Sequence, residues 1–163
     1  MDESKYDRMY EKLYRLFDGV TPLKKDCGVL CGRACCKGGD DVGMRLFPHE
    51  KTALRMTEND GARYAVCDGT CDRRLRPLSC RIFPFFPTAD ERGRTGIAAD
   101  IRGAGVCPLA RHADEIAVRR IFLRRMRLAA KMLAADAECL AFMREVTAEI
   151  EEAAALLEKM NGN

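Results

Sequence analysis

The cysteine content constrains this chain more than any other feature of its sequence. Nine of the 163 residues are cysteine, and eight of these nine lie between positions 27 and 107. A chain of this length can bury roughly 70% of the surface that its unfolded form exposes, so it does not need a cross-link or a metal merely because it is small. The clustered cysteines therefore need a chemical explanation.

The chain begins with MDESKYDRMYEKLYR, which is charged throughout and does not resemble a secretion signal. Charged residues also interrupt every apolar stretch well short of the roughly 18 residues needed to cross a bilayer. We therefore expect a cytoplasmic protein without a membrane partner. In a reducing cytosol, clustered cysteines are more often metal ligands or redox thiols than structural disulfides.

The spacing of the cysteines predicts a metal site. Residues 27–36 read C-x3-C-x3-C-C, residues 67–71 read C-x3-C, and single cysteines follow further along the chain. Thiolates a few residues apart on a tight loop can converge on one ion, because zinc takes four ligands at about 2.3 Å. The predicted ligands are Cys27, Cys31, Cys35, Cys36, Cys67, Cys71, Cys80 and Cys107.

Eight thiolates allow several kinds of centre. They suit two tetrahedral sites for zinc or iron, one binuclear site, or an iron–sulfur cluster with spare cysteines. The spacing lacks the C-x2-C-x2-C run of a bacterial ferredoxin. Neighbouring side chains usually diverge, so we expect Cys35 and Cys36 to serve different ions, or one of them merely to pack.

The charge balance gives little support to nucleic acid as a partner. The chain has 28 basic and 25 acidic residues and a net charge of +3. Arg120, Arg124 and Arg127 share a helix face opposite an apolar stripe with Phe122 and Met126, which predicts a solvated face. A regulatory or nucleic-acid-binding module that uses this basic helix is one alternative function.

Apolar residues recur at helical spacing in three parts of the chain. This spacing predicts an amphipathic helix over residues 4–18 and two further helices over about 110–134 and 137–160. The last two helices are expected to form a C-terminal hairpin, with Asp136 as the N-cap between them.

The regular pattern is weaker between these helices. Pro48 opens a predicted short helix that ends near Thr57. Three prolines exclude a regular helix over residues 67–87. Alternation over residues 97–101 predicts one short strand, which could pair with the segment before it.

The sequence therefore predicts a mainly α-helical fold with little β-structure. No repeat or linker divides the chain, so we expect a single domain over residues 1–163. A cysteine-rich, loop-dominated metal-binding region would occupy residues 27–110. The C-terminal helices would follow over residues 111–160.

Three segments of the chain together resemble a known family. They are DCGVLCGRACCKGGDDVGMRLFPHE, CDGTCDRRLRPLSCRIFPFFP and GVCPLA, which span about residues 27–110. They resemble the cysteine-rich CxxCxxCC family of zinc- or iron-chelating proteins, often called YkgJ-like. The chain departs from the family pattern in having three residues, where two are usual, between the first cysteines.

The resemblance implies a chelating function and a set of supporting residues. It places Cys35 and Cys36 at the family's cysteine pair and Cys67 and Cys71 at its intermediate pair. It also marks Glu50 as an acidic residue close to the site. The family's RP..CR.FPF segment is matched by Arg76, Pro77, Cys80, Arg81, Pro84 and Phe85.

We therefore expect Glu50, Arg76 and Arg81 to surround the ligands without binding the metal directly. Flagellin lysine N-methylase proteins share a similar cysteine framework. No glycine motif that could cradle a nucleotide supports methyl transfer in this chain.

Other residues with metal-binding side chains have simpler explanations. Cys139 lies beside an apolar helical stripe and is expected to pack as a small hydrophobic residue. His49 and His112 are not needed as ligands, because the cysteines suffice. The leading function is chelation of one or two zinc or iron ions, and an iron–sulfur redox protein or enzyme is the second hypothesis. The sequence is also compatible with a protein partner.

Overall fold

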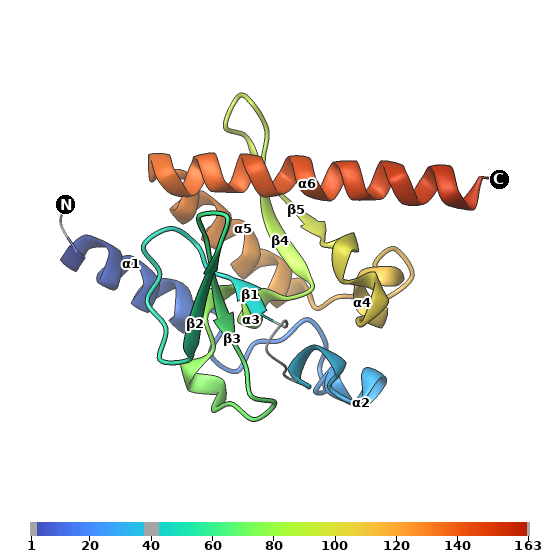
Figure 1. Ribbon diagram of the computed structural model, residues 1–163, viewed down its shortest axis with the longest axis horizontal. Coiled ribbons are helices and arrows are strands. Elements are labelled where there is room, and N and C mark those ends of the chain that lie inside the picture. Colours follow the sequence, from blue (N-terminus) through green and yellow to red (C-terminus); the bar gives the residue numbers. More distant parts are fainter. Residues whose placement is uncertain (1–2, 38–42, 163) are drawn as a thin grey trace.

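The computed structural model describes residues 3–37 and 43–162, which form helices and two small antiparallel sheets (Figure 1). The α-helices are α1 (Glu3–Leu16), α2 (Gly28–Cys31), α3 (Leu78–Ile82), α4 (Pro108–Arg111), α5 (Arg120–Ala134) and α6 (Ala137–Asn161). The 3-10 helices are η1 (Ala34–Cys36), η2 (Arg73–Leu75) and η3 (Ile101–Gly105). The strands are β1 (Gly43–Arg45), β2 (Arg55–Asn59), β3 (Ala62–Val66), β4 (Phe85–Ala89) and β5 (Thr95–Ala99).

The prediction of a mainly α fold with little β-structure is wrong. About 50% of the chain is helical and 15% is in strands, so the fold is mixed α/β. The first sheet has the order β1-β3-β2, with β3 paired antiparallel to both neighbours. The helix predicted from Pro48 to Thr57 does not form, because its last residues enter β2.

The turn between β2 and β3 explains this error. Asp60 and Gly61 both have positive φ, at 49° and 76°, as the two central residues of a tight hairpin turn require. The Asp-Gly pair predicted a turn, but the exposed polar residues of β2 lack the alternation of a half-buried strand. Pairing with β3 therefore decides the structure of this segment.

The second sheet confirms the predicted strand. β5 pairs antiparallel with β4, with Phe85 opposite Ala99 and Ala89 opposite Thr95. Successive side chains of a strand point to opposite faces, and β4 uses both. The Phe85 ring lies 5.6 Å from that of Phe122 on α5, and the next residue on β4 packs against α6. This strand therefore lies between the two long helices.

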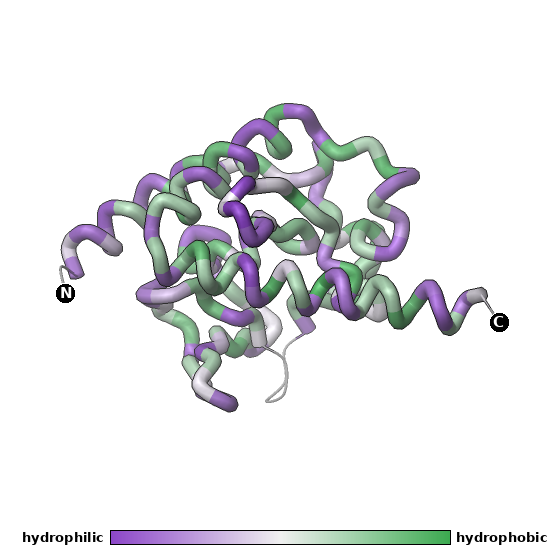
Figure 2. Tube along the Cα trace, turned by 90° about the horizontal axis from the view of Figure 1, so that it is seen from above, coloured by the Kyte–Doolittle hydropathy of each residue, from purple (hydrophilic) through white to green (hydrophobic). Residues whose placement is uncertain are grey.

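The long helices follow the predicted apolar pattern. α1 begins and ends close to the expected bounds of 4–18, and α6 close to those of 137–160. The Asp136 side chain accepts hydrogen bonds from the backbone N–H groups of Glu138 and Cys139, which confirms its role as N-cap. Hydrophilic and hydrophobic residues alternate along these helices in Figure 2.

The helix predicted over 110–134 is broken. α4 ends at Arg111, and α5 begins only at Arg120. The residues between these two helices are not helical. The Arg119 N–H donates to the carbonyl of Pro22 at 2.9 Å, so this long-range hydrogen bond takes the place of one within a helix. Arg120 and Arg124 are exposed on α5, opposite its buried residues, as expected of a solvated face.

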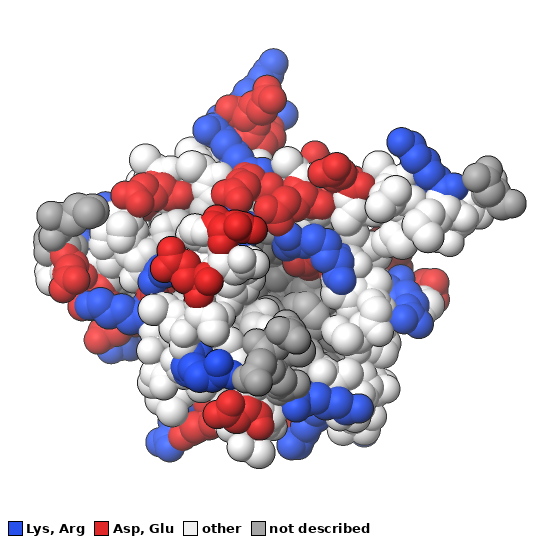
Figure 3. Space-filling model, viewed as in Figure 1, with Lys and Arg blue, Asp and Glu red and all other residues white. Residues whose placement is uncertain are grey.

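α6 is the longest of the described helices, and its C-terminal end projects beyond the other elements (Figure 1). Its buried residues end at Ile150, and Leu156 and Met160 beyond them are exposed. Acidic side chains gather along α6 on the face seen in Figure 3. Among the described helices, none is both long enough and apolar enough to cross a membrane.

Candidate metal centre

A single cavity of about 90 Å³ brings together all eight cysteines that the sequence predicts as ligands. Its walls come from α2, η1, the loop that leads to η2, α3 and the start of α4, with β1 and β3 behind them. The cysteines at its surface are Cys27, Cys31, Cys35, Cys36, Cys67, Cys71, Cys80 and Cys107.

α2 and η1 position the first four thiols. Cys27 precedes α2 and Cys31 ends it, so the two lie about one helical turn apart. Gly32 then stops the helix with a left-handed φ of 59°, a conformation that glycine adopts without steric cost. This reversal leads into η1, which carries Cys35 and Cys36 back to the cavity.

Cys35 and Cys36 do not diverge as expected of neighbouring side chains. Their sulfur atoms lie 3.9 Å apart, at hydrogen-bonding distance for two thiols. This contact lowers the pKa of Cys36 to about 6, assisted by the charge of Arg76, and raises that of Cys35. One thiol of the pair is therefore prepared to ionise near neutral pH.

Arg76 contributes a charged side chain to the cavity wall. Its Nε donates to the Cys71 sulfur at 3.2 Å, and its Nη2 to the Cys36 sulfur at 3.8 Å. A guanidinium hydrogen-bonded to sulfur stabilises the thiolate, which is the form that binds metal. Arg76 therefore joins two cysteines that are distant in sequence.

The loop with Cys67 and Cys71 lies against η1. Gly69 has a φ of 90°, and a Cβ at this position would lie 3.1 Å from the carbonyl oxygen of Lys37 and 3.4 Å from that of Cys36. Only glycine avoids both the strained backbone and the close approach. This contact fixes the loop beside Cys36.

The remaining two thiols belong to short helices, one within α3 and one directly before α4. The segment 67–87, expected to contain no helix, forms α3 between Pro77 and Pro84, and α3 carries Cys80. Burial raises the pKa of the Cys80 thiol to about 12. Cys107 directly precedes α4 and is buried, whereas Cys80 is half-buried.

Glu50 supports the site from a distance. Its carboxylate is fully buried outside the cavity wall and accepts hydrogen bonds from the backbone N–H groups of Leu78 at 2.6 Å and Phe47 at 3.1 Å. The Tyr14 hydroxyl donates to it at 2.8 Å. Burial raises the Glu50 pKa against the effect of these bonds. Because Leu78 begins α3, Glu50 holds the helix that carries Cys80.

Arg81 also forms hydrogen bonds with the backbone beside the site. Its guanidinium donates to the carbonyls of Arg74 and Arg76, each at 2.7 Å, and to the Asp18 carboxylate at 2.9 Å. The same group lies 4.7 Å from the Tyr14 ring centre. Arg81 therefore fixes the loop that presents the Arg76 side chain to the thiols.

The predicted non-ligands lie elsewhere. Cys139 is buried in the helical core, where its sulfur lies 3.9 Å from the Tyr10 hydroxyl, which confirms its packing role. The His49 ring stacks on that of Tyr6 at 3.9 Å. His112 contacts Glu115 on the surface.

The thiols line the cavity without converging on one point. Across residues 3–37 and 43–162, no three His, Cys, Asp or Glu side chains are arranged closely enough to hold an ion as they stand. All nine cysteines are free thiols. Eight soft sulfur donors around one cavity, with a guanidinium beside them, nevertheless match the ligand chemistry of zinc and iron–sulfur centres.

Two features of the surroundings have no signal in the sequence pattern. Met44 on β1, Leu54 directly before β2, and Phe83 give the cavity an apolar wall. Contacts between segments far apart in the chain determine this wall.

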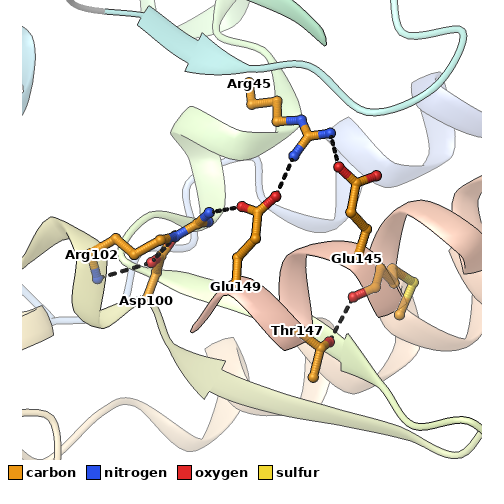
Figure 4. Close-up of polar contacts among 7 residues, drawn as sticks. Arg45, Asp100, Arg102, Glu145, Thr147 and Glu149 are labelled. Carbon is orange, nitrogen blue, oxygen red and sulfur yellow. Dashed lines mark hydrogen bonds and ion pairs between the residues drawn. The ribbon is translucent and has the colours of Figure 1, made fainter. Parts of the chain in front are cut away.

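The second feature is an ion-pair network on α6 (Figure 4). Arg45 donates to Glu145 at 2.7 Å and to Glu149 at 3.1 Å, and Glu149 also accepts from Arg102, which pairs with Asp100. Arg45 ends β1, and Arg102 lies on η3 shortly before Cys107. Glu149 therefore ties two segments that flank the cavity to one helix.

Comparisons with known protein families, curated proteins and solved structures give no match to this chain.

Proposed function

We propose that this protein binds zinc or iron through the thiolates of the eight cavity cysteines, as the resemblance to the CxxCxxCC family implies. The observation that carries the proposal is their assembly in one cavity from segments up to 80 residues apart. Packing alone gives no reason for eight free thiols to gather while the ninth lies in the helical core.

The surroundings of the thiols support metal binding. Arg76 contacts two of the sulfur atoms and would offset the negative charge that thiolate ligands bring. The apolar wall would exclude water and strengthen the interaction between metal and sulfur. A bound zinc or iron ion would supply the cross-link that draws the four cysteine-bearing segments together.

Zinc held by four thiolates has no open coordination position, so its role would be structural or chelating. An iron–sulfur cluster would instead accept electrons. We place the protein in the cytoplasm, because a reducing compartment keeps clustered thiols available for metal.

Elemental analysis with an absorption spectrum tests the proposal on protein purified without oxygen and without added metal. Near-stoichiometric zinc with a featureless visible spectrum would assign a zinc protein. Iron with sulfide and visible absorption would assign the redox alternative. Absence of metal with all thiols reactive would contradict the proposal.

A pair of variants links the metal to the cavity. Cys71→Ser removes a thiol that contacts Arg76, and we expect the metal content to fall. Cys139→Ser removes the thiol in the helical core and should leave the metal content unchanged. Equal metal content in both variants would show that the metal binds outside the cavity.

A further inference from the structure

Four of the cavity thiols form one group, which is defined by α2 and by the residues that pack beside it. Cys27 and Cys31 lie at the two ends of α2, and Cys107 packs with Cys27 in a small apolar cluster that includes Leu109. Cys35 lines the cavity from η1, which follows α2 in the chain. We name Cys27, Cys31, Cys35 and Cys107 the helical set.

The other four thiols surround Arg76. This guanidinium contacts the sulfur atoms of Cys71 and Cys36. Cys67 lies on the same loop as Cys71, and Cys80 lies on α3, which begins directly after Arg76 and Pro77. We name Cys36, Cys67, Cys71 and Cys80 the arginine set.

The two sets meet at adjacent residues of η1. The 3.9 Å contact between Cys35 and Cys36 joins them at hydrogen-bond length. Each set draws on segments distant in the chain, and each has the four thiols that a closed tetrahedral site requires. This division assigns every cavity cysteine once.

We infer, on the basis of the proposed function, that the cavity holds two metal ions, one in the helical set and one in the arginine set. Each divalent ion displaces four thiol protons, so each site carries two excess negative charges. Arg76 offsets one of these charges in the arginine set. The helical set lies against apolar side chains, so the arginine set fills first.

Titration of the reduced, metal-free full chain with Co²⁺ tests this order. Cobalt–thiolate absorption should saturate at two equivalents of Co²⁺. Alkylation followed by mass spectrometry should show the arginine set protected after the first equivalent and the helical set only after the second. Saturation at one equivalent, or protection of both sets in parallel, would overturn the two-site inference.

Single substitutions test which thiols belong to which set. Cys107→Ser and Cys80→Ser should each lower the capacity from two equivalents to one, and each should leave the opposite set protected. Cys139→Ala should keep both equivalents. Loss of both ions from either variant, while the wild-type chain binds cobalt at the cavity, would overturn the division and leave the proposed function standing.

The wild-type titration also separates the two claims. A wild-type chain that binds no Co²⁺ at its thiols would overturn both the inference and the proposed function. The protection pattern of the wild-type chain does not depend on a variant that folds.

Discussion

The helical core and the cysteine cavity are built in opposite ways. In the core, α1, α5, α6 and β4 bury large side chains, and Phe122 is fully buried between two other phenylalanine rings. Around the cavity, Val29 and Leu30 on α2 are 80% and 56% exposed, and seven of the eight cavity cysteines are only half-buried.

This contrast shows where each region obtains its stability. Burial of apolar surface contributes roughly 25 cal/mol per Å², which favours the core. α2 has 4 residues and α3 has 5, far shorter than the roughly 12 residues at which isolated helices become marginally stable. The cavity region therefore depends on contacts between segments and, under the proposed function, on the metal.

Removal of the metal is expected to have the largest effect. A chelator that competes with thiolates for the metal should abolish amide exchange protection around residues 27–36 and 67–75 and leave α5 and α6 protected, because the first two regions contribute no side chain to the main hydrophobic core. Hydrogen exchange with mass spectrometry measures this difference. Equal loss of protection in all four regions would show that the core, too, depends on the metal.

Phe122→Ala should destabilise the helical core rather than the cavity. It removes a fully buried ring that packs on Phe17 and Phe85, and should lower the free energy of unfolding by about 3–5 kcal/mol. Leu128→Ala, at a half-exposed position of the same helix, should cost far less. Denaturant unfolding measures both, and similar losses would contradict this description of the core.

Glu50→Gln tests the link between the two regions. The amide keeps the shape of the side chain but places an NH₂ group among three donors, which should cost about 1–3 kcal/mol in stability. Metal affinity should fall as well, because Glu50 holds the start of α3. Exposed Glu152→Gln is the matched control. Unchanged metal affinity with lowered stability would separate Glu50 from the cavity.

Asp136→Ala tests the cap of α6 in the core and should cost about 1 kcal/mol near neutral pH. Burial opposes ionisation of Asp136, but hydrogen bonds from Lys5, the Cys139 N–H and Tyr6 lower its pKa to about 2. The folded pKa lies below the unfolded value, so the stabilisation is present above about pH 4 and is lost as the pH falls toward 2.

Unfolding measured from pH 7 to pH 2 should therefore show the wild-type and Asp136→Ala curves approaching one another at low pH. Asp114→Ala, at an exposed position outside α6, should shift stability little at any pH. Curves that stay parallel from pH 7 to pH 2 would argue against the ionised cap.

Substitution in the ion-pair network should have the smallest effect. Glu149 and Glu145 are both partly exposed, so Glu149→Gln should cost roughly 0.2–1 kcal/mol and less at high salt. Glu145→Gln breaks one pair where Glu149→Gln breaks two, so it should cost less. Thermal unfolding at low and high salt measures both, and a larger loss for Glu145 would contradict the central place of Glu149.

Local patterns in the sequence were enough to predict part of the fold. The apolar stripe of α6, its cap at Asp136 and the alternating strand β5 all follow from residues close together in the chain. The spacing of the cysteines is also a local property of the sequence, and it identified the eight cysteines that line the cavity. Periodicity and capping are local properties, so they can be recognised without knowing the fold.

Tertiary structure alone decided the rest. β2 forms because β3 pairs with it, and α5 starts late because Arg119 bonds to Pro22. Arg76 contacts Cys71 and Cys36, and Glu50 accepts a hydrogen bond from Leu78 at the start of α3, only in the folded chain. Each of these depends on a contact between residues distant in sequence, and no local periodicity encodes such a contact, because it exists only once the chain has folded.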